Sequence, residues 1–357
     1  MVAFTADNHI GVTSQWSLKE RGEDFMRSFA DMVDKIVGME DERKTLIIGG
    51  DLFDSPLPPS FAVEFVQGQV RRLHERGCTV YGIDGNHDIS EGRWLRVCGI
   101  QPLSDVPTSL SGAPGLTACG VSYRRSADLV DELMTMVEAD AKCDILVLHL
   151  ALGELNRMGA ASDVTAAEML PLLKKLGTRL VLMGHIHIRQ SVVVDEVTFA
   201  YCGSTEVCSM NEQKDKSFEL VDPETLALSR VPIKTRPIEH TVIGTEAEFA
   251  KFTAGLEKDS PVLQSVFVAV GIADGVKRLR ALAKERNALM RIQTISADDE
   301  PDKTVDRSAG VLGLEQAIEL SFSPDSVEAG LIRAFLRSPG AVKLTVDKYL
   351  EDKGGVK

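Results

Sequence analysis

Short apolar runs that each end in a potential metal ligand are the feature that most limits how this chain can fold. The run Leu46-Ile47-Ile48 is typical of a buried strand, and Asp51 follows its end. Asp7 and His9 follow another expected strand in the same way, and Asn86 follows a third. In α/β proteins, bound molecules and ions sit just outside the carboxyl ends of the parallel strands. The pattern therefore predicts one polar site assembled from several strand ends.

Strands and helices are expected to alternate through the first half of the chain. The expected strands are 2–6, 45–49, 78–83, 144–148 and 179–183, and the expected helices are 21–37, 60–76, 126–140 and 165–176. This alternation implies a parallel sheet with right-handed crossovers. Residues 90–125 are weakly patterned and are expected to form loops and short strands. Four strand-like segments within 190–234 predict an antiparallel second sheet.

Two prolines and a charged segment indicate where the chain divides. A chain of 357 residues exceeds one average domain, and Pro232 and Pro237 mark a boundary. A small α/β unit is expected after them, with elements at 266–270, 274–289 and 290–295. The charged residues that follow are typical of a linker, and helix signals resume beyond it. The expected division is 1–236, 237–297, 298–312 and 313–357.

The composition is that of a soluble globular protein. Hydrophobic residues make up 44% of the chain and charged residues 26%, and no apolar run approaches the roughly 18 residues of a membrane span. The amino terminus lacks a basic leader, so a cytoplasmic protein with no membrane partner is expected. Six cysteines without a CxxC pair are expected to be reduced thiols. The net charge of −13 argues against nucleic-acid binding over the whole surface but leaves a local basic groove open.

The histidines reinforce the strand-end pattern. Five of the seven, at positions 9, 87, 149, 185 and 187, come just after expected strands, whereas His74 and His240 do not. A single histidine after a strand is more often structural than catalytic, but five beside Asp7, Asp51 and Asn86 are hard to attribute to chance. Oxygen ligands with imidazoles suit Mn, Fe or Zn, and two such ions about 3.5 to 4 Å apart hold both oxygens of a phosphoryl displacement. These residues therefore favour a two-metal phosphoesterase.

Five motifs in a fixed order, DxH, GDxxD, GNHD, a lone His after a strand, and GHxH, resemble those of the calcineurin-like metallophosphoesterases. Asp7-Asn8-His9-Ile10-Gly11, Gly49-Gly50-Asp51-Leu52-Phe53 and Gly184-His185-Ile186-His187 are similar to the SbcD-type nucleases of double-strand-break repair. Arg21-Gly22-Glu23-Asp24-Phe25 and Gly203-Ser204-Thr205-Glu206 resemble the same branch. The resemblance covers residues 1–235. It implies a four-layer α-β-β-α metallophosphoesterase sandwich, here with a small α/β capping domain and a carboxyl-terminal helical segment.

The resemblance also implies a role for each strand-end residue. The implied ligands of two Mn²⁺ ions are Asp7, His9 and His187 for the first, Asn86, His149 and His185 for the second, and Asp51 as the bridge. His87 is implied to be a non-ligand that stabilises the transition state or protonates the leaving oxygen, and Asp88 is expected to hold its ring in the right tautomer. Asp54 is expected to support the ligands or to form a turn. Arg189 either meets a DNA phosphate or is an ordinary exposed arginine beside a turn.

Partners follow from the same resemblance. Nuclease domains of this family pair as two-fold homodimers through amino-terminal helices, here 21–37 and 60–76. The apolar stripe of 21–37 is only wide enough for its own core, so the dimer contacts are expected from 60–76 or from the loops around Arg93 and Trp94. A DNA-capping domain comes next, here 237–297, where basic residues line a DNA groove or form a solvated helix face: Lys277, Arg278, Arg280, Lys284, Arg286 and Arg291. The family ends in helices that grip an SMC-like ATPase of the SbcC type, here 313–357. The apolar residues of segment 313–357 either dock on that ATPase or pack within the chain: Leu331, Ile332, Phe335, Leu336, Val346, Tyr349 and Leu350.

Three functions stay open on the sequence. The leading one is a Mn-dependent DNA nuclease, exonucleolytic on double-stranded ends and endonucleolytic on single strands or hairpins, that acts with an SMC-like ATPase in double-strand-break repair or recombination. The alternative is a small-molecule or nucleotide phosphodiesterase of the same superfamily, which the long extension after the core disfavours. A non-catalytic scaffold is disfavoured because no ligand is missing. The sequence leaves the host, cellular or viral, and the cleavage polarity open.

Overall fold

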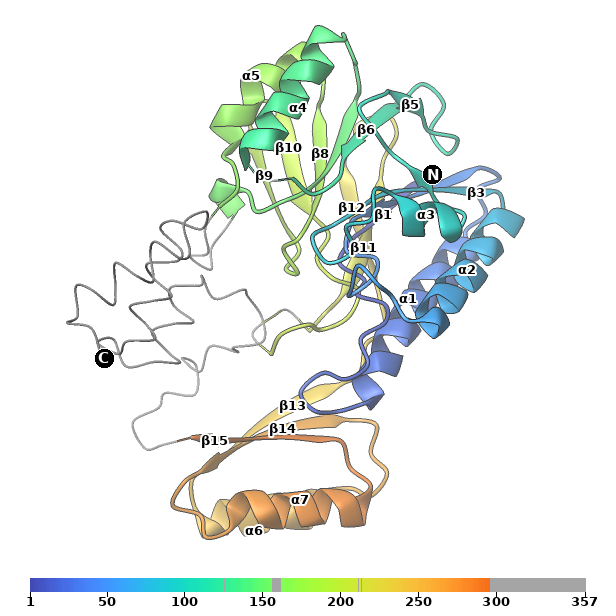
Figure 1. Ribbon diagram of the computed structural model, residues 1–357. Coiled ribbons are helices and arrows are strands. Elements are labelled where there is room, and N and C mark those ends of the chain that lie inside the picture. The colour runs from blue at the N-terminus through green and yellow to red at the C-terminus, as the bar shows by residue number, and fades with distance from the viewer. Residues whose placement is uncertain (125, 156–161, 211, 213, 296–357) are drawn as a thin grey trace, which may run out of the picture. The chain divides into compact units, whose positions relative to one another are not determined.

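The computed structural model describes residues 1–124, 126–155, 162–210, 212 and 214–295, and Figure 1 shows how their elements are arranged. The linker expected at 298–312 and the helical segment expected at 313–357 lie outside the described residues, as do the apolar residues named above for partner docking. None of the described helices combines the length and apolar character that a membrane crossing requires.

The first sheet places three of the expected strands side by side. β1, β2, β3 and β4 run parallel, as the alternation of strands and helices predicts. β11 pairs antiparallel with β1, and β12 pairs antiparallel with β11. The order is β12 (Leu228–Pro232), β11 (Ser217–Val221), β1 (Val2–Thr5), β2 (Lys44–Gly49), β3 (Cys78–Ile83) and β4 (Gln101–Pro102).

The second sheet has the same size and a parallel centre. β6, β7, β8 and β10 run parallel, and short antiparallel strands close both edges. The order is β5 (Thr108–Ser109), β6 (Thr117–Val121), β7 (Ile145–His149), β8 (Leu180–Gly184), β10 (Val197–Tyr201) and β9 (Gln190–Val194).

The strands of 190–234 correct one expectation, because they do not form an antiparallel sheet of their own. β9 and β10 extend the second sheet, and β11 and β12 extend the first. The physical reason is that β1 and β8 would otherwise each present an unpaired row of backbone N–H and C=O groups. A local alternating pattern identifies a strand but does not identify the edge that it pairs with.

Helices cover the outer face of each sheet (Figure 1). α1 and α2 pack on the first sheet, and α4 and α5 pack on the second, as the buried side-chain clusters show. A third cluster, which includes Phe4, Ile47 and Val147, fills the space between the sheets. The predicted α-β-β-α sandwich is thereby confirmed. The helices are α1 (Glu20–Val37), α2 (Ser60–Glu75), α3 (Arg93–Val97), α4 (Ser126–Glu138), the short 3₁₀ helix η1 (Gly153–Leu155) and α5 (Ala166–Leu176).

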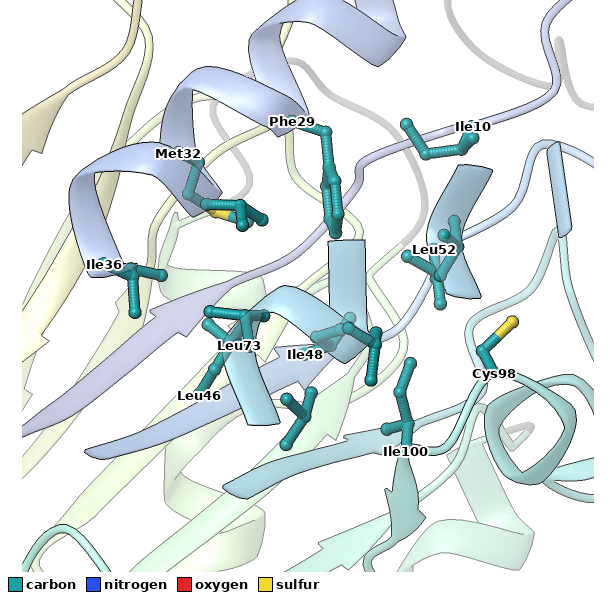
Figure 2. Close-up of a cluster of buried hydrophobic side chains, with 14 of the residues drawn as sticks. Ile10, Phe29, Met32, Ile36, Leu46, Ile48, Leu52, Leu73, Cys98 and Ile100 are labelled. Carbon is teal, nitrogen blue, oxygen red and sulfur yellow. The ribbon is translucent and has the colours of Figure 1, made fainter. Parts of the chain in front are cut away.

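The cluster under α1 and α2 supports the polar edge of the first sheet (Figure 2). Phe29, Met32 and Ile36 come from one face of α1, at the helical spacing seen in the sequence, and are fully buried. Leu52, also fully buried, lies directly after the expected ligand Asp51. Burial of each such side chain contributes roughly 1.5–3 kcal/mol to folding. The loop that carries Asp51 is thus anchored by apolar packing immediately beside the carboxylate.

Residues 238–295 form a three-stranded parallel sheet with its own core. The elements in chain order are β13 (Ile238–Ile243), α6 (Glu246–Gly255), β14 (Leu263–Ala269), α7 (Gly275–Arg286) and β15 (Met290–Ile295). The last three agree with the elements expected from the sequence. β13 and α6 were not expected, because β13 does not alternate and is buried only at its two ends, and α6 is largely exposed, with one buried side chain, Phe249.

Candidate metal centre

The expected site residues lie on corners that follow β1, β2, β3, β7 and β8. Asp7, His9, Asp51 and His185 all have positive φ, which non-glycine residues rarely adopt. The corners after β1 and β2 are also bonded to each other, since the N–H of Asp7 donates to the Gly50 carbonyl at 3.1 Å and that of His9 donates to the Asp51 carbonyl at 3.0 Å. The parallel ladder therefore continues into the site and fixes the two corners as one unit.

Two glycines allow these corners to approach so closely. Gly50 has a φ of +91°, and a Cβ there would lie 2.4 Å from the His149 Nδ1. A Cβ on Gly85 would lie 2.1 Å from Asp51 Oδ1. Any larger residue at either position would push a proposed ligand out of place.

Asp51 lies at the middle of the cluster and is 1% exposed. Its Oδ1 accepts from the backbone N–H of His87 at 2.8 Å. Its Oδ2 lies 3.3 Å from His149 Nε2 and 3.9 Å from His9 Nε2. Burial opposes ionisation of this carboxyl, but the charges of His149 and His9 outweigh burial and hold its pKa well below the usual range. A single carboxylate thus faces imidazoles on both sides.

One side of the cluster, called here the Asn86 end, consists of Asn86, His149 and His185. The Asn86 Oδ1 lies 3.0 Å from His149 Nε2 and 2.9 Å from His185 Nδ1. The other nitrogen of His149, Nδ1, lies 2.8 Å from the Gly49 carbonyl, which fixes the ring. The two rings differ in charge: burial disfavours the proton on both, but Asp51 raises the pKa of His149 to about 9, whereas burial and the charge of His149 lower that of His185 to about 3.

The opposite side, called here the His187 end, consists of Asp7, His9 and His187. The Nε2 atoms of His9 and His187 lie 3.2 Å apart. Burial disfavours a proton on His9, but Asp54, Cys208 and Asp51 raise its pKa to about 9. The pKa of His187 is also well above its ordinary value, because Cys208 and Glu212 outweigh burial. The Asp7 carboxylate links this end to the other, since its Oδ1 accepts from the backbone N–H of His185 at 2.8 Å.

The donor set fits a pair of divalent ions. Asp7 Oδ2 is buried and has no hydrogen-bond partner within the described residues, a costly arrangement for a carboxylate oxygen unless a cation meets it. Ligand atoms of Asp7, Asp51 and His149 lie within 4.8 Å of one another, and so do those of His9, Asp51 and His87. The structure brings all seven predicted ligands together.

His87 faces outward at the same edge, with 44% of its side chain exposed. Its Nδ1 lies 3.3 Å from the Asp54 backbone carbonyl and 3.8 Å from the Asp54 carboxylate. Its ring packs edge-on against His9, with centroids 4.8 Å apart. The ring is therefore held beside the cluster while much of it stays exposed to solvent.

Asp88 does not hold the His87 ring, contrary to the expectation from the sequence. Its carboxylate is 2% exposed and accepts from the backbone N–H groups of Gly85 at 2.7 Å and Phe53 at 3.1 Å. Burial and the charge of Asp51 raise its pKa to about 6. Asp88 thus ties the corner after β3 to the corner after β2, and Asp54 occupies the place beside His87 that was expected for Asp88.

Sequence reasoning missed Glu212, whose Oε1 lies 3.2 Å from His187 Nδ1. Lys216 holds the same carboxylate, with its Nζ 2.5 Å from Oε2. Sequence reasoning also missed Cys208, which lies beside His9 and His187. The resemblance of residues 203–206 to the SbcD-type branch was a local signal for this part of the site. Glu206 is fully buried and accepts a hydrogen bond from Arg21 at 3.3 Å. The segments 21–25 and 203–206, which both resemble that branch, therefore contact each other.

Two of the basic residues proposed for DNA contact form ion pairs within the chain. The guanidinium of Arg189 pairs with the buried carboxylate of Glu219 and is 38% exposed. On α7, Arg278 pairs with Glu246 at 2.9 Å and stacks over the ring of Phe249, with its Cζ 3.8 Å from the centroid. At least these two cations therefore stabilise the fold. DNA contact by Arg189 stays a prediction.

Comparisons with known proteins agree with this geometry. The family model described as calcineurin-like phosphoesterase matches residues 1–189. The chain is similar to the DNA double-strand break repair protein Mre11 of Methanocaldococcus jannaschii, at 28% identity over 62% of this chain and 62% of that protein. The Mre11 protein of Haloferax volcanii is 27% identical over 66% of this chain and 53% of its own length. The SbcD component of the nuclease SbcCD of Escherichia coli K12 is 25% identical over 61% of this chain and 65% of its own length. The matches thus span between about half and two thirds of these relatives.

Proposed function

The chain belongs to the calcineurin-like phosphoesterase family, and we propose that it is a Mn-dependent DNA nuclease of double-strand-break repair or recombination. The observation that carries the proposal is the convergence of Asp7, His9, Asp51, Asn86, His149, His185 and His187 at the carboxyl ends of five strands. The names of the relatives support DNA as the substrate. A pair of divalent ions bound there would offset the negative charge of a phosphodiester and activate the attacking water.

The chain's own residues supply orientation and one proton. Asp51 separates the two ends, and the Gly49 and Asp54 carbonyls fix the rings of His149 and His87. The Asp54 carbonyl accepts from Nδ1–H of His87. When the ring carries both protons, Nε2–H is therefore the group left to donate a hydrogen bond to the phosphate or a proton to the leaving oxygen. His87 is therefore proposed as the catalytic acid, and Asp54 as the residue that positions it.

The test is cleavage of defined DNA by the purified chain with Mn²⁺. Blunt duplexes labelled at either end, single strands and hairpins should all be cut, and Mg²⁺ should support the reaction far less well because its strict octahedral preference suits imidazoles poorly. Asp51→Asn provides the inactive control. Hydrolysis of bis(p-nitrophenyl) phosphate or a cyclic nucleotide with no cleavage of any DNA would instead favour the small-molecule phosphodiesterase.

The assembly is part of the proposal. Residues 237–297 are proposed to cap DNA, residues 313–357 to bind an SMC-like ATPase, and the amino-terminal helices to form a homodimer. A pull-down with a co-expressed SbcC-type ATPase tests the partner, with Leu331→Asp and Phe335→Asp together as the disrupting variant. Light scattering tests the dimer, and a species of only 38.8 kDa at micromolar concentration would contradict it.

A further inference from the structure

Cys208 differs from the other cysteines in its surroundings. The five others, Cys78, Cys98, Cys119, Cys143 and Cys202, are buried, whereas Cys208 is only partly buried. Its thiol sulfur and the ligand nitrogens of His9 and His187 lie within 4.8 Å of one another. The sulfur therefore stands at the His187 end, on the same side as two nitrogens that already face each other.

The backbone of Cys208 is fixed on both sides. Its N–H donates to Glu212 Oε2 at 3.1 Å, and its carbonyl accepts from Gln15 Nε2 at 2.6 Å. Glu212 is the residue that also contacts His187, at 3.2 Å from Nδ1. One buried carboxylate thus positions both the imidazole and the cysteine, so the closeness of the two side chains does not depend on a free loop.

The separation agrees with a shared ion. Bonds to zinc are about 2.3 Å from sulfur and 2.0–2.1 Å from imidazole nitrogen, so two such ligands of one ion lie at most about 4.4 Å apart. The sulfur and the two nitrogens all lie within 4.8 Å of one another, which is close to this limit. The present contact of the thiol with the Glu206 carbonyl, at 3.4 Å, is weak and can be given up on coordination.

We propose that Cys208 is an additional ligand of the ion at the His187 end. This inference rests on the proposed metal-dependent function and deepens it. Coordination forms a sulfur–metal bond and releases the thiol proton to solvent. A thiolate beside His9 and His187 raises the affinity of this end for thiophilic ions such as Zn²⁺ or Cd²⁺ more than for Mn²⁺, whereas the Asn86 end offers only amide, carboxylate and imidazole donors.

Spectroscopy of the full-length chain tests the assignment directly. Metal-free protein is titrated with Co²⁺, and thiolate ligation is read from a sulfur-to-cobalt charge-transfer band in the near ultraviolet. The wild type and the control Cys98→Ser should both develop the band, because burial raises the pKa of the Cys98 thiol to about 12 and keeps it protonated. Cys208→Ser should lack the band, and its affinity for Cd²⁺ should fall about tenfold or more, with a smaller change for Mn²⁺.

Each outcome decides the question. A wild-type chain that binds Co²⁺ without the band overturns the proposal, whether or not the variant folds, and so does a band that persists in Cys208→Ser. The ¹¹³Cd resonance of the wild type, which moves strongly downfield on thiolate ligation, gives the same answer without any substitution. The proposed function fails separately: a chain that shows the band but cuts no DNA with any metal has the ligand and lacks the nuclease activity.

Discussion

The Asn86 end and the His187 end hold the same number of imidazoles but fix them by different means. At the Asn86 end, His149 rests on the backbone carbonyl of Gly49, and an amide oxygen faces both rings. At the His187 end, carboxylates face the rings, Asp54 at 3.2 Å from His9 and Glu212 at 3.2 Å from His187. The Asn86 end is therefore positioned by the fold, and the His187 end is positioned by charge.

This difference has an energetic consequence. A carboxylate behind an imidazole stabilises its protonated form in the absence of metal and strengthens it as a ligand once the proton has left. A backbone carbonyl orients a ring with a much smaller effect on its charge. The His187 end should thus respond more steeply to pH, and more strongly to substitution of side chains that contact no ion, than the Asn86 end, where Asp51 raises the pKa of His149 alone.

The largest effect is expected where the two ends meet. Asp51→Asn removes a charge that faces imidazoles on both sides, so both ions should be lost and DNA cleavage should fall on the order of 10⁴-fold or more. Elemental analysis and a Mn²⁺-dependent nuclease assay measure the two losses. Retention of one full ion in this variant would show that the ends are independent.

His87 belongs to neither end, and its substitution separates chemistry from metal binding. His87→Asn should lower turnover on the order of 10² to 10⁴-fold while the metal content stays unchanged, because the ring is exposed and acts on the substrate. His185→Ala provides the contrast, since it removes a ligand and should lose the ion of the Asn86 end. Equal metal loss in the two variants would mean that His87 is itself a ligand.

Glu212→Gln sharpens the comparison without touching a ligand. The change keeps the size of the side chain but removes the charge behind His187, so affinity at the His187 end should fall about 10- to 100-fold. The affinity at the Asn86 end should hardly change. Glu64→Gln, on the exposed face of α2, is the matched control. Two-site Mn²⁺ titration by electron paramagnetic resonance resolves the ends, and equal weakening of both would contradict the assignment.

The smallest difference is expected in the pH dependence. Metal binding must displace a proton from each imidazole whose pKa is raised, so affinity should rise with pH at both ends up to about pH 9. The pKa values of both His9 and His187 are raised at one end, and that of His149 alone at the other. The extra imidazole proton makes the slope steeper at the His187 end by about tenfold per pH unit, and the thiol proton released on coordination of Cys208 would steepen it further. Isothermal titration at several pH values measures it; equal slopes would remove the distinction.

The metal-free protein should show the opposite trend in stability. His9 and His149 have pKa values raised to about 9, above the ordinary 6.5, so their protonated forms stabilise the fold below pH 6.5. That contribution is lost as the pH rises through about 9. Thermal unfolding of the chelated chain across this range gives the measurement.

The positions of the proposed ligands could be predicted from the sequence because each one lies at or just after the end of a strand, and the end of a parallel strand specifies a place in space. Glu212 could not, because it lies in a loop and reaches His187 across 25 residues without any periodic signal. Asp88 was given the wrong partner because its neighbour in sequence, His87, points away from it into solvent. The pairing of β11 with β1 was missed because edge partners depend on which strand is left open, not on the pattern of the segment that fills the edge.

The ladder that joins the corners after β1 and β2 bears on how the chain is made. His9 and His187 are separated by 178 positions, so a ribosome has synthesised most of the sandwich before the second of the two facing nitrogens exists. Until β8 has been made, the nascent chain carries only Asp7, His9, Asp51, Asn86 and His149 of the proposed ligands. At a synthesis rate of about 5–20 residues per second, the interval between the two histidines is on the order of ten seconds or more. Whichever ion the cell supplies in that interval reaches the enzyme first.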